Sequence, residues 1–136
     1  MTSVVELLHR RALMSEARIV LGKSGEDLAV QELRRRGYEI VARRWRRRRG
    51  EIDIVARDGK TLVFVEVKAR DGDAFGDGAE AVTALKRRRI VALATEYLAC
   101  HRLVDCPCRF DVVSIRIEGG RPDVELFQHA FDASGV

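Results

Sequence analysis

The sequence lacks the signals that direct a chain into or across a membrane. No apolar run approaches the roughly 20 residues that a membrane-spanning helix needs. The N-terminus has no early basic patch followed by an apolar run and an export cleavage site. No internal repeat or linker divides the 136 residues, a length typical of one domain. We therefore expect a cytoplasmic protein with no membrane partner, built as an N-terminal extension or helix over residues 1–20 and a single domain over residues 21–136.

Cysteine is scarce, and its three copies, Cys100, Cys106 and Cys108, are odd in number. Together with His101 they could be drawn as a metal site. Structural zinc sites, however, usually space their cysteines by two or more residues, and no second cysteine pair exists in this sequence. We expect reduced, partly buried thiols, as in a reducing cytosol, with a zinc site as the alternative.

Positive charge is concentrated in two runs, residues 43–49 and 86–89, while the whole chain carries a formal charge of +4. The first run places six arginines around Trp45 and cannot be a core strand, so we expect a solvated edge or loop there. Guanidinium groups such as those of Arg44, Arg46 and Arg48 match phosphates bidentately, and Trp45 could stack on an unpaired base or pack on the core. The charge pattern therefore favours a polyanionic partner such as nucleic acid.

Residues 50–70 read as two strands joined by a tight turn at Asp58-Gly59, a dipeptide that suits a two-residue hairpin loop. With that loop, the residue numbers of two paired positions add up to 117, so Asp53 is expected to face Phe64. Asp53 and Glu66 then become diagonal neighbours, roughly 7–8 Å apart between backbones and within joint reach of one ion.

Because side chains alternate along a strand, this hairpin is expected to have a polar and an apolar face. The polar face holds Glu51, Asp53, Glu66 and Lys68, together with Leu62 and Phe64; the apolar face holds Ile52, Ile54, Val63, Val65 and Val67. Both faces are apolar enough to be covered. Buried carboxylates are costly unless they are paired or bind metal. The cluster is therefore either a salt-bridge group, with Lys68 neutralising Glu66, or a metal site.

The remaining pattern predicts an α/β fold with a mixed central sheet flanked by helices, in the order α-β-β-β-α-β-β. A helix begins after an N-cap at Ser24 and ends at Gly37, with Glu26 on the inward stripe formed by Ala29, Val30 and Leu33. A second helix is expected over about residues 79–99. Its predicted buried side contains Val82, Leu85, Ile90, Leu93, Ala94, Tyr97 and Leu98. Strands are expected over about residues 38–46, 109–117 and 124–131.

The spacing of Asp53 and Glu66-Val67-Lys68 resembles the PD-(D/E)xK nuclease signature. From about residue 21 to residue 131 the chain resembles the YraN-type family of small bacterial nuclease-like proteins, whose restriction-endonuclease-like fold is related to archaeal Holliday junction resolvases. The matching pieces are Gly25-Glu26, Gly37-Tyr38, Gly50-Glu51-Ile52-Asp53, Val63 to Lys68, Arg70, Phe75-Gly76, Ala81-Val82, Lys86 and Cys108 to Val113. Arg87 departs from the pattern, in which glutamine often follows the helix lysine.

The resemblance implies roles for individual residues in a metal site. Asp53, Glu66 and the Val67 carbonyl would hold Mg²⁺, with Mn²⁺ as a substitute. Lys68 would orient or deprotonate the attacking water or neutralise the developing charge. Glu26 would tie a second ion or position the first, and Glu51 would act similarly or support the ligands.

The resemblance also implies a substrate and an assembly. Arg70, Lys86, Arg87 and the two basic runs would bind the nucleic-acid backbone, which gives affinity and salt dependence without sequence specificity. We therefore expect a Mg²⁺-dependent, structure-selective endonuclease acting on DNA, for example branched DNA, and a homodimer as in the resolvases. The alternative is a non-catalytic nucleic-acid-binding module that keeps the nuclease fold.

Overall fold

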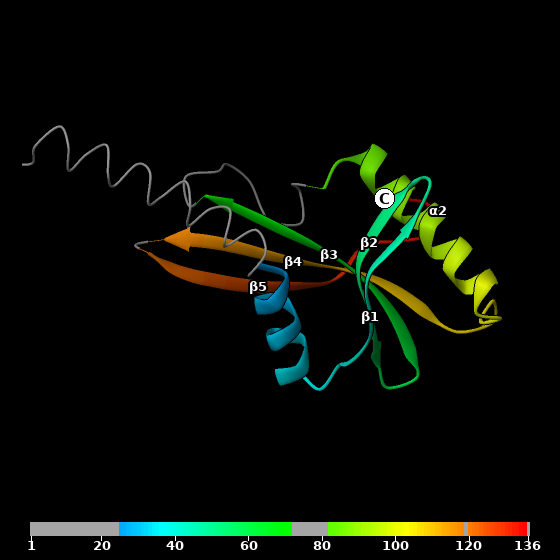
Figure 1. Ribbon diagram of the computed structural model, residues 1–136, viewed down its shortest axis with the longest axis horizontal. Helices are drawn as coiled ribbons and strands as arrows, with labels where there is room; N and C mark the ends of the chain where they lie inside the picture. Colours follow the sequence, from blue (N-terminus) through cyan, green and yellow to red (C-terminus); the bar gives the residue numbers. More distant parts are fainter. Residues whose placement is uncertain (1–24, 72–81, 119, 136) are drawn as a thin grey trace, which may run out of the picture.

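The computed structural model describes residues 25–71, 82–118 and 120–135, which form a five-stranded sheet with a helix on each face (Figure 1). The strands follow the chain in order across the sheet: β1 (Glu39–Arg47), β2 (Gly50–Asp58), β3 (Thr61–Asp71), β4 (Cys108–Glu118) and β5 (Arg121–Phe131). One helix covers residues 25–35 and is called the Glu26 helix below; the other is α2 (Ala84–Cys100). The predictions for residues 1–20, Ser24 and Phe75 lie outside the described residues.

The sheet is mixed, as the sequence predicts. β1, β2 and β3 pair antiparallel, β3 and β4 pair parallel, and β4 and β5 pair antiparallel. The parallel pair is joined through α2, because parallel neighbours need a long crossover connection. β1 is an edge strand, so the arginines of residues 43–47 lie on a solvated edge as predicted.

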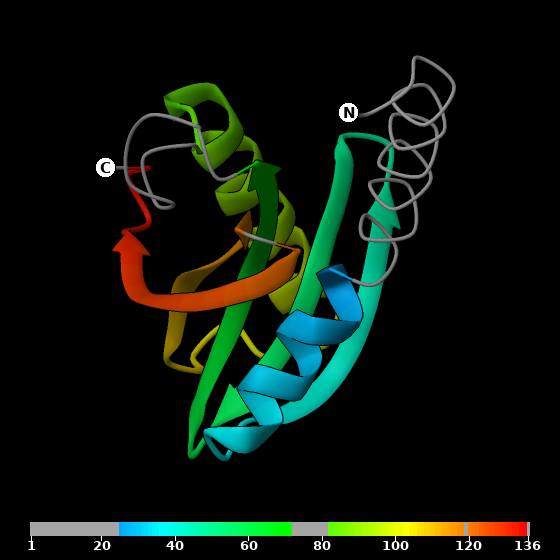
Figure 2. The same cartoon turned by 90° about the vertical axis from the view of Figure 1, so that its left-hand side faces the viewer.

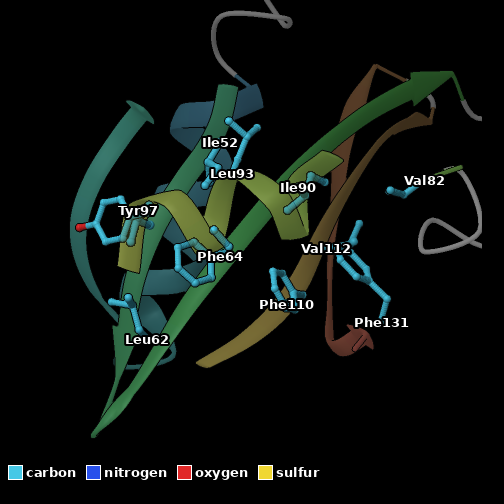
Figure 3. Close-up of a cluster of buried hydrophobic side chains, with 12 residues drawn as sticks. Ile52, Leu62, Phe64, Val82, Ile90, Leu93, Tyr97, Phe110, Val112 and Phe131 are labelled. Atoms are coloured by element: carbon cyan, nitrogen blue, oxygen red, sulfur yellow. The ribbon is translucent and has the colours of Figure 1, made fainter. Parts of the chain in front are cut away.

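Two apolar cores fill the two faces of the sheet, and Figure 2 shows the Glu26 helix on one side and α2 on the other. The Glu26 helix buries Ala29, Val30 and Leu33, the stripe predicted from the sequence. The α2 core (Figure 3) is built around Phe64, Leu93 and Tyr97. The prediction that both faces are covered is confirmed.

α2 begins later than predicted, at Ala84, and Thr83 caps it by accepting a hydrogen bond from the Lys86 N–H. The prediction that Leu85 is buried is wrong, because 62% of this residue is exposed. The buried stripe contains Ile90, Leu93, Ala94 and Tyr97. One turn before Ile90 that stripe reaches Lys86 rather than Leu85, since residues four apart share a helix face.

The hairpin turn lies one residue later than predicted, at Gly59-Lys60. Asp58 pairs with Thr61 and Ile54 with Val65, so paired positions sum to 119 rather than 117. Gly59 has a φ of +62°, and a two-residue turn with glycine first needs no such angle at Asp58. The β2–β3 ladder ends at the pair of Ile54 and Val65, so Asp53 lies just beyond it, and Phe64 pairs with Val55 rather than with Asp53.

The alternation of side chains along β2 breaks at Asp53. Ile52 packs in the α2 core, whereas Ile54 packs under the Glu26 helix, so the prediction that they share a face is wrong. On β1 the neighbouring irregularity is Arg44, a non-glycine residue with a φ of +53°. It lies between Arg43, which pairs with Ile54, and Trp45, which pairs with Ile52. Asp53 therefore lies at the point of β2 where the alternation of side chains between the two faces is broken.

Candidate functional site

The Asp53 carboxyl group lies close to that of Glu66, whose negative charge acts on it directly. Asp53 accepts a hydrogen bond from the Val67 backbone N–H at 2.8 Å, which fixes its carboxylate against β3. Glu66 is buried, with only 4% of the residue exposed. Burial, followed by the negative charge of Glu66, raises the pKa of Asp53 from an ordinary 3.8 to about 7. The structure thus brings together the two acids that the sequence singled out.

Lys86 of α2, not Lys68, is the cation that pairs with Glu66. The Lys86 ammonium forms an ion pair with Glu66 Oε1. Lys68 is half-buried and has no ion pair among the described residues. The interpretation in which Lys68 neutralises Glu66 is therefore wrong about the partner.

Glu26 contacts two arginines of β1, Arg43 and Arg44. Its Oε2 accepts from Arg44 Nε at 2.8 Å, and its buried Oε1 lies 3.6 Å from Arg43 Nε without a hydrogen bond. In the described part of the chain, no three His, Cys, Asp or Glu side chains are grouped so that they could hold a metal. Glu26 therefore does not join Asp53 and Glu66 in a three-carboxylate cluster there. Its predicted metal-binding role stays a prediction.

Glu51 is paired with Arg46 across the β1–β2 ladder, at 2.7 Å between Oε2 and Nε. Both side chains are at the surface, with 29% of Glu51 and 73% of Arg46 exposed. This surface pair adds little stability, since exposed ion pairs contribute about 0–1 kcal/mol. It keeps Glu51 engaged at the edge of the sheet.

The two basic runs, far apart in the sequence, lie side by side in the structure. A Cβ built on Gly50 would stand 3.5 Å from Arg89 Cδ and 3.7 Å from Leu93 Cδ1, so α2 passes directly against the β1–β2 turn. Figure 1 shows that turn beside the first half of α2. Arg48 and Arg49 in the turn are exposed, as are Arg88 and Arg89 on the helix. Together these four arginines are called the basic surface below.

Three other residues were predicted to contact nucleic acid: Trp45, Arg70 and Arg87. They are not part of the basic surface. Trp45 packs edge-on against Tyr97 at 5.2 Å and lies under Arg47, 4.7 Å from its ring centroid, which favours the core-packing alternative over base stacking. The Arg87 Nε donates to the Val82 carbonyl, and its guanidinium lies over Phe131. The Arg70 side chain lies outside the described residues.

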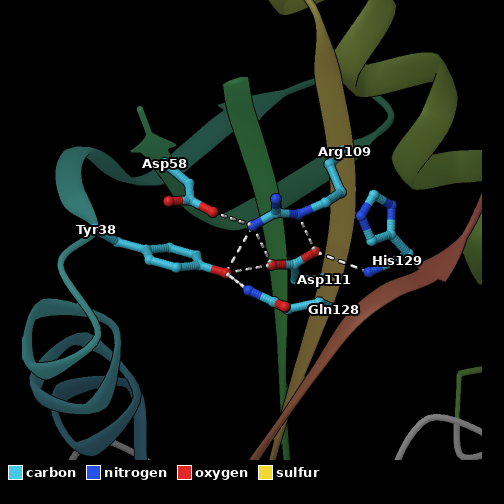
Figure 4. Close-up of polar contacts among 6 residues, drawn as sticks. All are labelled: Tyr38, Asp58, Arg109, Asp111, Gln128 and His129. Carbon is cyan, nitrogen blue, oxygen red and sulfur yellow. Dashed lines mark hydrogen bonds and ion pairs between the residues drawn. The ribbon is translucent and has the colours of Figure 1, made fainter. Parts of the chain in front are cut away.

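A second polar group, which the sequence did not predict, surrounds the buried side chain of Asp111 (Figure 4). Asp111, fully buried, accepts hydrogen bonds from the Tyr38 hydroxyl, from Arg109 and from the His129 backbone N–H. Arg109 also pairs with Asp58 at 3.0 Å, and Gln128 donates to the Tyr38 hydroxyl. The available signal was a charged residue interrupting the apolar run of β4. With every acceptor of Asp111 engaged, the group ties β4 to β5 and to the start of β1.

Asp111→Ala is expected to destabilise the protein by about 3–5 kcal/mol, because it leaves the largely buried Arg109 without its closest counter-ion. Chemical denaturation would measure the change in the free energy of unfolding. Asp123→Ala, on the exposed part of β5, is the matched control and should change stability by less than about 0.5 kcal/mol. Equal effects of the two substitutions would contradict a structural role for the Asp111 group.

The three cysteines are free thiols. Cys100 and Cys108 are exposed, so the prediction of partly buried thiols holds only for Cys106. His101 stacks on Tyr97 with ring centroids 4.0 Å apart, and its Nδ1 lies 2.8 Å from the Tyr97 carbonyl. No metal-binding group of these residues exists within residues 82–118, so the zinc alternative has no support.

No helix in the described part of the chain combines the length and the hydropathy that a membrane-spanning helix requires.

Comparison with known proteins identifies the family of this chain. The model of the uncharacterised protein family UPF0102 matches residues 25–115, which include the Glu26 helix, the hairpin, α2 and most of β4. A UPF0102 protein of Geobacter metallireducens is 50% identical over 112 residues, covering 82% of this chain and 92% of its own. Relatives from Anaeromyxobacter dehalogenans and Symbiobacterium thermophilum are 47% and 49% identical over 120 and 114 residues, covering 88% and 83% of this chain and 90% and 97% of theirs. The chain therefore belongs to the UPF0102 family.

Proposed function

We propose that this protein is a Mg²⁺-dependent, structure-selective nuclease that acts on the DNA backbone through a PD-(D/E)xK site in a restriction-endonuclease-like fold. The observation that carries the proposal is the adjacency of Asp53 and Glu66. They form a largely buried acidic pair at the point of β2 where the side-chain alternation is broken. A buried acidic pair is unfavourable for folding by itself. Such arrangements concentrate at functional sites.

The donor set fits Mg²⁺. This ion prefers oxygen ligands and is usually held by one or two carboxylates, with waters and substrate phosphates completing its shell. Asp53 and Glu66 supply the two carboxylates, and the Val67 carbonyl would be a further ligand. The absence of a third carboxylate among the described residues is compatible with this ion. When bound, Mg²⁺ or Mn²⁺ would lower the pKa of a water and offset charge on the phosphate.

The side chains around the pair have separate roles in this proposal. Lys68, half-buried and with no ion pair in the described chain, would take the proton of the attacking water or stabilise the developing negative charge. The Val67 N–H holds the Asp53 carboxylate in place. Glu26 orders Arg43 and Arg44 at the edge of β1.

The basic surface supports contact with phosphates rather than bases. Within residues 25–71, 82–118 and 120–135, the Phe, Tyr and Trp side chains are buried or only partly exposed, and none of them belongs to the basic surface. Contacts from arginine to phosphate position the nucleic acid without reading its sequence. Selectivity would then depend on the shape of the DNA, as in a branched junction.

Replacing both Arg48 and Arg49 with glutamine is expected to weaken DNA binding by a similar factor for duplexes of different sequence. The slope of log affinity against log salt should fall by about one for each phosphate that the variant no longer neutralises. Fluorescence anisotropy over a salt series measures both quantities. Arg34→Gln combined with Arg121→Gln removes the same charge from other exposed positions and should leave the slope unchanged. Sequence-dependent losses would argue against backbone recognition.

A cleavage panel tests the proposed function. Linear duplex, single strand, flap and four-way junction substrates are incubated with the protein and Mg²⁺ or Mn²⁺. We expect cleavage of at least one structured substrate, abolished in Glu66→Ala. Absence of cleavage from the whole panel, or equal cleavage by the variant, would contradict the proposal.

The second candidate is a nucleic-acid-binding module without turnover. The ion pair between Lys86 and Glu66 favours it, because a lysine already neutralises one of the two acids. In that case DNA binding to the basic surface would persist in Glu66→Ala and would not respond to Mg²⁺. The same panel, with binding measured beside cleavage, separates the two candidates.

A further inference from the structure

We propose that Lys86 is a positioning residue that couples cation binding to phosphate binding: its ammonium neutralises Glu66 when no cation is bound, and moves to a phosphate of the nucleic acid when a divalent cation takes its place. This inference rests on the proposed function. It assigns Lys86 a second role beyond phosphate contact.

The ion pair is asymmetric in its exposure to water. The Lys86 side chain is 41% exposed, whereas the Glu66 side chain is 5% exposed. An exposed ammonium on a flexible stem can leave the pair and be hydrated, but the buried carboxylate cannot. Glu66 therefore needs a cation in either state, and Lys86 is the partner that can be exchanged.

Lys86 does not owe its place to the stability of α2. It is the third residue of the helix, where the helix dipole favours anions and opposes cations. The first turn of α2 contains no acidic residue that would compensate. Lys86 lies instead one turn before Ile90, where it continues the buried stripe of Ile90 and Leu93 toward the sheet. This placement serves the contact with Glu66.

Charge makes the two cations exclude each other. Asp53 and Glu66 together carry two negative charges when ionised, which one divalent ion neutralises. An ammonium held on the same Glu66 oxygen would then be repelled by the ion at short range. One turn farther along α2, Arg89, which belongs to the basic surface, lies against Gly50. The released ammonium is therefore next to the surface where phosphates would bind.

The consequence is a measurable linkage between two ligands. If cation binding frees Lys86 for phosphate, DNA must tighten cation binding by the same factor that the cation tightens DNA binding. Such couplings typically amount to about 5- to 150-fold. Removing the ammonium should raise the affinity for the cation alone and abolish most of the coupling.

The test measures Mn²⁺ binding by electron paramagnetic resonance with and without a saturating 20-base-pair duplex. A Lys68→Met background prevents cleavage during the measurement. With Lys86 present, we expect the duplex to tighten Mn²⁺ binding by about 10-fold. In Lys86→Met, Mn²⁺ should bind about 10-fold tighter without DNA, and the duplex should change its affinity by less than about two-fold. Lys86→Arg, which keeps the charge, should keep the coupling.

Arg88→Met is the matched control, because it removes one exposed positive charge from the same helix without contact to Glu66. It should weaken DNA binding and leave both Mn²⁺ affinity and coupling unchanged. If Mn²⁺ binds but Lys86→Met changes neither the affinity nor the coupling, the inference is overturned while the proposed function stands. If no variant binds Mn²⁺ even with the duplex, both are overturned.

Discussion

Lys68→Met is expected to lower the rate of DNA cleavage by about 10²- to 10⁴-fold, the usual contribution of a positioned proton-transfer group. Lys68 follows Glu66 on β3 with one residue between them, and no described carboxylate pairs with it. The loss should therefore reflect the chemical step and not a broken salt bridge. Single-turnover cleavage of the best substrate in the panel, at saturating Mg²⁺, measures it.

Lys60→Met is the control for this substitution, because Lys60 is an exposed lysine in the hairpin turn at the far end of β3. It should cleave at the wild-type rate. The thermal unfolding midpoint and Mn²⁺ binding of Lys68→Met should both remain close to those of the wild type. A variant that cleaves normally would remove Lys68 from the mechanism. Cleavage lost together with metal binding would make Lys68 a support for the acidic pair instead.

Asp53→Asn is expected to stabilise the metal-free protein above neutral pH while destroying the cation site. Burial and the charge of Glu66 raise the pKa of Asp53 to about 7, so between about pH 4 and pH 7 the folded state holds a proton that the unfolded chain releases. Stability therefore falls as the pH rises through that window. An asparagine carbonyl can still accept the Val67 N–H and carries no charge to bury.

The gain for Asp53→Asn is expected to be about 1–3 kcal/mol larger at pH 8 than at pH 5, because pH 5 lies inside the window in which the folded carboxyl is still protonated and pH 8 lies above it. Urea denaturation at both pH values, with a chelator present, measures it. Asp123→Asn, at an exposed position of β5, should show no such difference between the two pH values. A variant less stable than the wild type at pH 8 would mean that Asp53 is not under electrostatic strain.

The pairing of Asp53 with Glu66 could be predicted from the sequence despite an error in the turn. Moving the loop from Asp58-Gly59 to Gly59-Lys60 changes the sum of paired positions by two. A change of two keeps every side chain on its face, because strand side chains alternate with a period of two. Asp53 and Glu66 are therefore neighbours in the structure as they are in the prediction. The faces of Glu66, Phe64 and Val65 remained right.

Other features needed the tertiary structure. The break in alternation that separates Ile52 from Ile54 accompanies a positive φ at Arg44, a residue type that gives no local sign of it. The ion pair between Lys86 and Glu66 depends on where α2 begins. Because the helix begins at Ala84, two residues before Lys86, the side of α2 that carries Lys86 faces the sheet. The Asp111 group joins residues as far as 90 positions apart, beyond any local pattern.

Calorimetric titration of the protein with Mg²⁺ and Mn²⁺ is the sharpest test of the proposed cation site. We expect one site in the wild type, with affinity that rises with pH up to about pH 7 as Asp53 loses its proton. Asp53→Ala should lose that site, whereas Asp123→Ala should retain it. A wild type that binds neither ion even with DNA present, or an Asp53→Ala variant that binds as the wild type does, would contradict the proposed site.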